Sequence, residues 1–144
     1  MTNTILGLHH ITAIAGNAQS NYDFYAKVLG LRMVKKTVNF DDPETYHFYY
    51  GNEKGEPGTI LTFFPWDGIG KGHTGVGMAT EIGYAVPAGS FDFWVNRFKE
   101  LNVSFSEKVE RFGEINLPFT DPDGLNITLV IPARSEERRV GKEC

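Results

Sequence analysis

Cysteine is almost absent from this chain of 144 residues, whose single thiol is Cys144. One thiol cannot close an internal disulfide, and it offers no thiolate cluster for a zinc or iron–sulfur site. The sequence also contains no apolar run of about 18 residues, the length that spans a bilayer. The first residues, MTNTILGLHH, lack the basic start and apolar core of a secretory signal. These absences predict a cytoplasmic protein with no membrane partner.

A concentration of positive charge is missing as well. The formal net charge is −4, and Lys and Arg are scattered along the chain. Nucleic-acid binding needs a basic surface that neutralises phosphates, so a nucleic-acid partner is not expected. Hydrophobic residues make up 41% of the chain and aromatic residues 13%, enough for a folded core. A small-molecule ligand is therefore the expected partner.

The character of the sequence changes after the apolar segment NITLVIPA, where RSEERRVGKEC follows. We hypothesise that residues 134–144 are a non-native tail translated from a sequencing adapter, and that the native protein continues beyond Ala133. Such segments are excluded from fold reasoning. The tail contains the only cysteine, so cysteine chemistry is not expected anywhere in the native part.

Two segments repeat the same order of elements. Residues 5–66 and 80–133 each read as a strand, an amphipathic helix and three further strands, with Asp23-Phe24-Tyr25 and Asp92-Phe93-Trp94 at matching places. Asn17 or Ser20 is the expected cap of the first helix, and Ser90 that of the second. The sequence thus predicts an α+β fold of two tandem βαβββ units.

Residues 67–79, DGIGKGHTGVGMA, are expected to link the units. The segment holds five glycines, which raises the alternative of a phosphate-binding loop. It lacks the Lys-Ser/Thr ending of such loops, and no helix begins where its glycines end. A crossover between two sheet units is the better interpretation, and His73 within it is expected to be solvated.

His9 and His10 are adjacent in the expected first strand. Neighbouring strand residues point to opposite faces, so one imidazole should face the concave side of the sheet, where a metal or substrate could bind. The pattern alone does not decide between a ligand and an ordinary strand histidine. His47, among strand aromatics, is expected on a sheet face near the substrate. The aromatic run could line an aromatic-substrate pocket or simply pack the core: Tyr46, Phe48, Tyr49, Tyr50, Phe63, Phe64 and Trp66.

The segments LGLHHITAIAG, NYDFYAKVLGLRMVKKTVNFD and TYHFYYGN resemble the start of the ring-cleaving dioxygenases that act on hydroquinones, within the vicinal-oxygen-chelate (glyoxalase/bleomycin resistance/dioxygenase) superfamily. The resemblance covers about residues 5–133. It implies that His10 is an iron ligand, with His9 and Thr12 as catalytic residues beside it. It also implies four βαβββ units in total, of which this chain has the amino-terminal two, and two further ligands, a histidine and a glutamate, from the later half.

The resemblance implies an Fe(II)-dependent extradiol-type dioxygenase, with Mn(II) as the alternative metal, a diphenol and dioxygen as substrates, and a homo-oligomer. The two units alone are expected to be inactive and to self-associate. Glu81 is the one carboxylate within them that could be a further ligand. Two alternatives stay open: a glyoxalase-like metal-dependent lyase or isomerase, and a metal-free module that binds small antibiotics.

Overall fold

A computed structural model describes residues 4–5, 7–68, 70, 72 and 76–132 of the protein. The chain forms two compact units, Met1–Lys71 and Gly72–Cys144, and their boundary lies within the predicted linker 67–79. His73 and the tail 134–144 lie outside the described residues. In the part of the chain that is described, no helix is long and apolar enough to cross a membrane.

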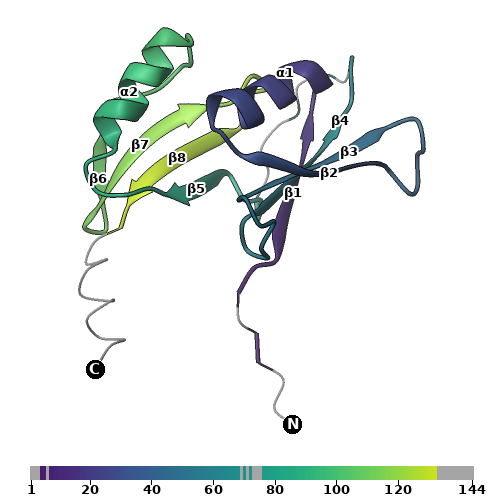
Figure 1. Cartoon of the computed structure of the whole chain (residues 1–144), viewed down its shortest axis with the longest axis horizontal. Coiled ribbons are helices and arrows are strands. Elements are labelled where there is room, and N and C mark those ends of the chain that lie inside the picture. The colour runs from purple at the N-terminus through teal and green to yellow at the C-terminus, as the bar shows by residue number, and fades with distance from the viewer. Residues whose placement is uncertain (1–3, 6, 69, 71, 73–75, 133–144) are drawn as a thin grey trace. The chain divides into compact units, whose positions relative to one another are not determined.

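The first unit is a four-stranded sheet with one helical segment (Figure 1). Its elements are β1 (His10–Ala15), α1 (Ala18–Tyr22), the π-helical turn η1 (Asp23–Val28), β2 (Arg32–Val38), β3 (Tyr46–Gly51) and β4 (Ile60–Pro65). The strand order is β1-β4-β3-β2, with β1 parallel to β4 and the other pairs antiparallel.

The second unit repeats this arrangement. Its elements are β5 (Glu81–Ala85), α2 (Phe91–Glu100), β6 (Val109–Arg111), β7 (Glu114–Thr120) and β8 (Asn126–Ile131). The strand order is β5-β8-β7-β6, with β5 parallel to β8. The predicted pair of βαβββ units is therefore confirmed. β6 has only three residues, shorter than the strand expected from FSEKVERF, although Phe105 still bridges to Phe119.

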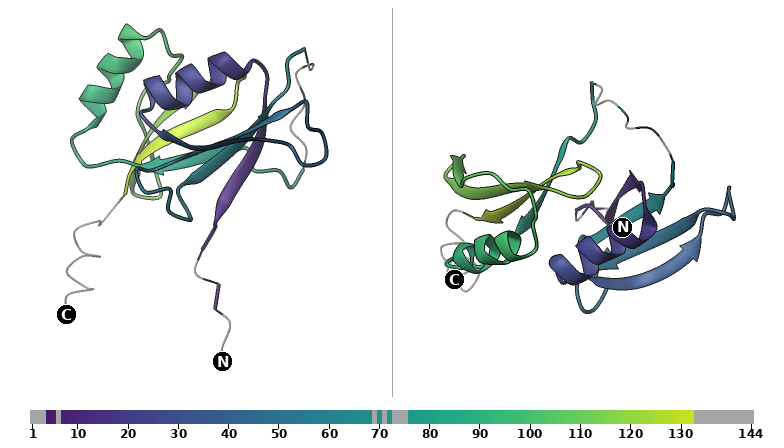
Figure 2. Two further views of the ribbon diagram at one scale, coloured as in Figure 1. Left: turned by 45° about the vertical axis from the view of Figure 1, so that its right-hand side comes forward. Right: turned by 90° about the horizontal axis from the view of Figure 1, so that it is seen from above.

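Each helix covers one face of the sheet in its own unit (Figures 1 and 2). In the first unit, Tyr25 is fully buried and its ring lies 4.7 Å from that of Phe63 and 5.3 Å from that of Tyr50. The Tyr50 hydroxyl donates to the side-chain oxygen of the buried Asn21 at 2.8 Å. Burial raises the pKa of the Tyr50 phenol far above its ordinary value. In the second unit the corresponding core forms around Phe98, which packs on Phe119 at 4.7 Å.

The ends of the helices follow local rules with one exception. The Asn17 side chain accepts a hydrogen bond from the Ser20 amide at 2.9 Å, so Asn17 is the cap of α1. Gly30 takes φ +75° and ends the first helix, as expected of a glycine at this place. Ser90 occupies the cap position of α2 but makes no capping bond, because its hydroxyl donates to the Pro87 carbonyl at 2.7 Å.

Candidate functional site

The predicted site residues His10 and Thr12 lie on one face of the first sheet, the face that α1 and η1 do not cover. We call it the open face. Alternation along β1 puts His10, Thr12 and Ile14 on this face and exposes all three, whereas Ala15 on the helix side is buried. In the parallel pairing with β4, His10 lies opposite Ile60 and Thr12 lies opposite Thr62.

His9 and His10 contact each other. Their Nδ1 atoms are 3.0 Å apart and the rings meet edge to face, with centroids separated by 5.2 Å. This differs from the expectation that the two side chains point to opposite faces. The strand begins only at His10, so strand alternation does not govern the orientation of His9. When His10 donates from Nδ1 to His9, its Nε2 carries the lone pair that a metal would bind.

A line of hydrogen bonds crosses the open face from β1 to β3. The Thr62 hydroxyl donates to the Thr12 hydroxyl at 2.7 Å. His47 Nε2 lies 3.1 Å from the Thr62 hydroxyl, and His47 Nδ1 lies 3.0 Å from the Tyr49 hydroxyl. Thr62 is fully buried, and His47 and Tyr49 are half-buried. Thr12 ends this line and stands two residues from His10 on the same face.

The charges around His47 favour its neutral form. Burial lowers the pKa of the His47 imidazole below its ordinary value of 6.5, and electrostatic repulsion from Lys35 and His10 lowers it further. The Lys35 ammonium lies over the Tyr49 ring, 5.2 Å from its centroid. His47 also stacks on Phe64, with ring centroids 4.0 Å apart. His47 lies on the open face, because its imidazole contacts the Thr62 hydroxyl that also bonds to Thr12. That it lies near a substrate stays a prediction.

The aromatic run divides between the two faces of the first sheet. Phe48, Tyr50 and Phe63 are buried on the side that the helix covers, where they form the core. Tyr49 and Phe64 are half-buried on the open face. Tyr46 and Trp66 are each about half exposed. Core packing is thus confirmed for the three buried residues. A substrate-lining role for Tyr49 and Phe64 stays a prediction.

No group of three or more His, Cys, Asp or Glu side chains that could hold a metal ion occurs among the residues that the structure describes. Glu81, the other ligand candidate, is the first residue of β5. Its carboxylate forms an ion pair with the Arg111 guanidinium at 2.9 Å, and both side chains are partly exposed. This pairing competes with metal coordination by Glu81. The role of His10 as a metal ligand stays a prediction.

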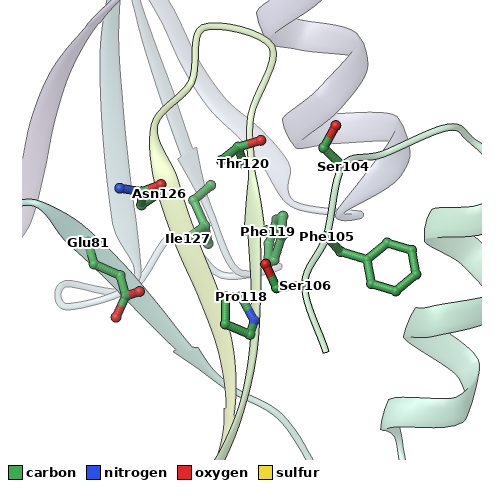
Figure 3. Close-up of a pocket in the computed structure, with 9 residues that line it drawn as sticks. All are labelled: Glu81, Ser104, Phe105, Ser106, Pro118, Phe119, Thr120, Asn126 and Ile127. Atoms are coloured by element: carbon green, nitrogen blue, oxygen red, sulfur yellow. The ribbon is translucent and has the colours of Figure 1, made fainter. Parts of the chain in front are cut away.

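The second unit has a pocket between β5, β7, β8 and the segment 104–106 (Figure 3). Glu81 stands at one margin of the pocket, and Ser104 and Phe105 stand at the other. None of its lining residues is a histidine or a cysteine, and Glu81 is the one charged group among them. Glu81 is thus the one strong metal donor among these lining residues, and a single carboxylate does not make a transition-metal site.

The bonds between Thr62, His47 and Thr12 could not be found by scanning for motifs. Thr12 and Thr62 are fifty positions apart, and they meet because β1 pairs with β4 in parallel. The available signal was the alternation in TYHFYYGN, which puts His47 and Tyr49 on one face. The side of the sheet on which they lie follows only from the packing of the helix.

Comparison with known proteins agrees with the resemblance noted in the sequence. The chain is 55% identical over 130 residues to a Bacillus subtilis protein named "Putative ring-cleaving dioxygenase MhqO", covering 90% of this chain and 41% of that protein. It is 44% identical over 119 residues to the "Chlorohydroquinone/hydroquinone 1,2-dioxygenase" of Sphingobium indicum, covering 81% and 37%. A crystal structure of a putative dioxygenase from Bacillus subtilis matches with a TM-score of 0.86 and 53% identity, covering 92% of this chain and 42% of that one.

This chain therefore spans about two fifths of the length of these relatives. The family model described as Glyoxalase/Bleomycin resistance protein/Dioxygenase superfamily matches residues 7–129, most of the chain. The two βαβββ units and the relatives named as ring-cleaving dioxygenases agree with this match. The chain therefore belongs to the Glyoxalase/Bleomycin resistance protein/Dioxygenase superfamily.

Proposed function

We propose that this chain carries part of the active site of an Fe(II)-dependent, extradiol-type ring-cleaving dioxygenase that acts on hydroquinone-like diphenols. The observation that carries the proposal is the exposed His10 on the open face, bonded through Nδ1 to His9 and two residues from the Thr12 hydroxyl. The name of the Sphingobium relative, at 44% identity, supports the choice of substrate class.

The residues of the open face fit one position of a ferrous site. Fe(II) in such enzymes is held by two histidines and one carboxylate, which leaves room for substrate and dioxygen. His10 would be one of the histidines, and His9 would accept the proton of its second ring nitrogen. We assign the other two ligands to residues that correspond to the remaining length of the relatives. When bound, Fe(II) would supply the Lewis-acid and redox chemistry that lets a diphenol react with dioxygen, and Mn(II) is the alternative ion.

The neighbouring side chains would bind and orient the substrate. Thr12 lies on the same face as His10, about 7 Å along the strand, within reach of an oxygen on a ring held at His10. Its hydroxyl would donate a hydrogen bond to that oxygen. The stacked rings of His47 and Phe64 present an aromatic edge on the same face. With one ligand of three, the two units are expected to be inactive by themselves, and homo-oligomer formation stays a prediction.

The proposal is tested in a chimera, in which a relative of full length supplies the other two metal ligands. Residues 7–129 of this chain would replace the matching segment of MhqO, and the purified chimera would be tested for Fe(II) binding and for oxygen uptake with hydroquinone. We expect one Fe(II) per chimera and turnover. His10→Ala should abolish stoichiometric Fe(II) binding and reduce oxygen uptake to that of the metal-free protein.

Glu81→Gln is the matched control, since it removes the other candidate ligand, which is paired with Arg111. It should leave both Fe(II) binding and oxygen uptake close to those of the parent chimera. If His10→Ala keeps its iron while Glu81→Gln loses it, His10 is not the ligand. Hydroquinone binding that survives His10→Ala, in a chimera without turnover, would instead indicate a metal-free binding module.

A further inference from the structure

The four side chains that cross the open face form a hydrogen-bond line with a definite direction. A hydroxyl has one proton to donate, and the Thr62 proton is used on Thr12. The bond between Thr62 and His47 Nε2 must then be donated by the imidazole. A neutral ring has one N–H, so His47 Nδ1 is unprotonated and accepts from the Tyr49 hydroxyl.

Three features favour this direction over the reverse. A phenol is a stronger hydrogen-bond donor than an aliphatic hydroxyl, and the imidazole nitrogen is a strong acceptor, so Tyr49 suits the donating end. Burial and the Lys35 charge lower the pKa of the His47 imidazole, which keeps the ring neutral with one N–H. Thr62 is fully buried and has both its donor and its acceptor function satisfied within the line.

The second unit supplies an internal comparison. Thr62 pairs with Thr12 and Tyr49, and Thr128 correspondingly pairs with Gly83 and Pro118. Gly83 has no side chain to receive a proton at the place of Thr12. The Thr128 hydroxyl has two acceptors instead, the Asn116 side-chain oxygen at 3.4 Å and the Leu129 carbonyl at 3.5 Å. Asn116 precedes Pro118 by two residues, as His47 precedes Tyr49. In the first unit, by contrast, β1 carries the Thr12 hydroxyl, and the Thr62 hydroxyl donates to it.

We infer that Thr62 and His47 are positioning residues that turn the Thr12 proton away from the sheet and toward an oxygen of the diphenol bound at His10. The inference rests on the proposed function, which gives Thr12 its substrate contact. The Thr12 oxygen accepts from Thr62, so its own proton remains free for the substrate side. Each bond in the line polarises the next, which makes Thr12 a stronger donor than an isolated threonine.

The direction can be measured without turnover. In the full chain of 144 residues, the nitrogen chemical shifts of His47 report which ring nitrogen carries the proton, and His47→Asn assigns the signals. We expect the Nε2–H tautomer. Tyr49→Phe removes the donor to Nδ1 and should lower the population of that tautomer. A dominant Nδ1–H tautomer in the unsubstituted chain overturns the inference, because the line would then run outward and consume the Thr12 proton.

The functional consequence is tested in the MhqO chimera with a pair of variants at one position. Thr62→Val keeps the shape of the side chain and removes its hydroxyl, whereas Thr62→Ser keeps the hydroxyl. We expect Thr62→Val to lower kcat about tenfold with KM for hydroquinone nearly unchanged, and Thr62→Ser to restore most of the loss.

An unchanged kcat in Thr62→Val overturns the inference, and so does an equal loss of kcat in Thr62→Ser, which would indicate a packing role. Fe(II) content, measured in each variant, should stay at the parent level. The proposed function fails separately, through retention of iron and turnover in His10→Ala. Failure of the inference can therefore be distinguished from failure of the proposed function.

Discussion

At the start of β1, the Nδ1 atoms of two adjacent imidazoles lie 3.0 Å apart, a hydrogen-bonding distance. This contact also bears on which ring nitrogen of His10 carries the proton. When His10 is the donor, its lone pair stays on Nε2, and His9 then selects the tautomer of His10 and limits the rotation of its ring. The metal affinity of His10 should therefore depend on a neighbour that need not touch the metal.

Replacing His9 tests this dependence. His9→Ala removes the acceptor, and we expect the chimera to bind Fe(II) about 10- to 100-fold more weakly, the usual effect of losing such a partner. His9→Asn offers an amide oxygen near the place of Nδ1 and should recover much of the affinity. Calorimetric titration with Co(II), a redox-stable substitute, gives the affinities. Equal affinities for His9→Ala and the parent would show that His9 does not orient His10.

At the scale of single elements, the two helices begin differently. Asn17 accepts a hydrogen bond from the Ser20 amide at 2.9 Å, whereas the Ser90 hydroxyl is used on the Pro87 carbonyl at 2.7 Å. Asn and Ser are both preferred residue types at a helix N-cap. The chain before α2 folds so that Pro87 competes for the Ser90 side chain, and the difference arises from that turn.

The difference predicts unequal costs for the same kind of change. Asn17→Ala should lower the free energy of unfolding of the first unit by about 1 kcal/mol, the usual cost of losing a capping bond. Ser90→Ala removes no capping bond from α2, and its cost to the second unit should be about half of that or less. Urea unfolding followed by circular dichroism measures both. A larger loss in Ser90→Ala would contradict the assignment of the two caps.

The strands and helices were predictable because their apolar residues recur at the spacing of one structure or the other. Alternation in LRMVKKTVNF indicates β2, and the aromatic-rich YHFYYGN indicates β3, before any contact is known. The buried Asn21 was not predictable, because a polar residue enters a core only when a partner such as the Tyr50 hydroxyl is there. The π-helical turn η1 was not predicted either, because amino-acid composition does not distinguish a π-helix from an α-helix.

The candidate site was predictable only in its local part. His9, His10 and Thr12 are close in sequence, and the resemblance assigned them roles. The contact between the two imidazoles contradicts simple alternation, since His9 precedes the strand. Thr62 enters through the parallel pairing of β1 with β4, a non-local contact that no short motif encodes.

Across the whole chain, one topology is used twice with different chemistry. His10 and Glu81 are each the first residue of a strand, and each lies opposite the first residue of the parallel neighbour, Ile60 and Asn126. Glu81 therefore corresponds to His10. One unit presents an imidazole at this place, and the other presents a carboxylate paired with Arg111. The repeat preserves the fold, and the function depends on which side chains occupy its open positions.

Each unit has its own core, so we expect one unit to unfold while the other stays folded. The core of the second unit centres on Phe98, which is fully buried, and that of the first on Tyr25, also fully buried. Phe98→Ala should cost about 3–5 kcal/mol, the range for deleting a buried aromatic ring. Because the two units are compact by themselves, we expect hydrogen exchange to accelerate in β7 and β8 while β3 and β4 keep their protection. Tyr25→Ala is the matched variant and should give the opposite pattern. If either change exposes the strands of both units equally, the chain unfolds as one cooperative body and its cores are energetically coupled.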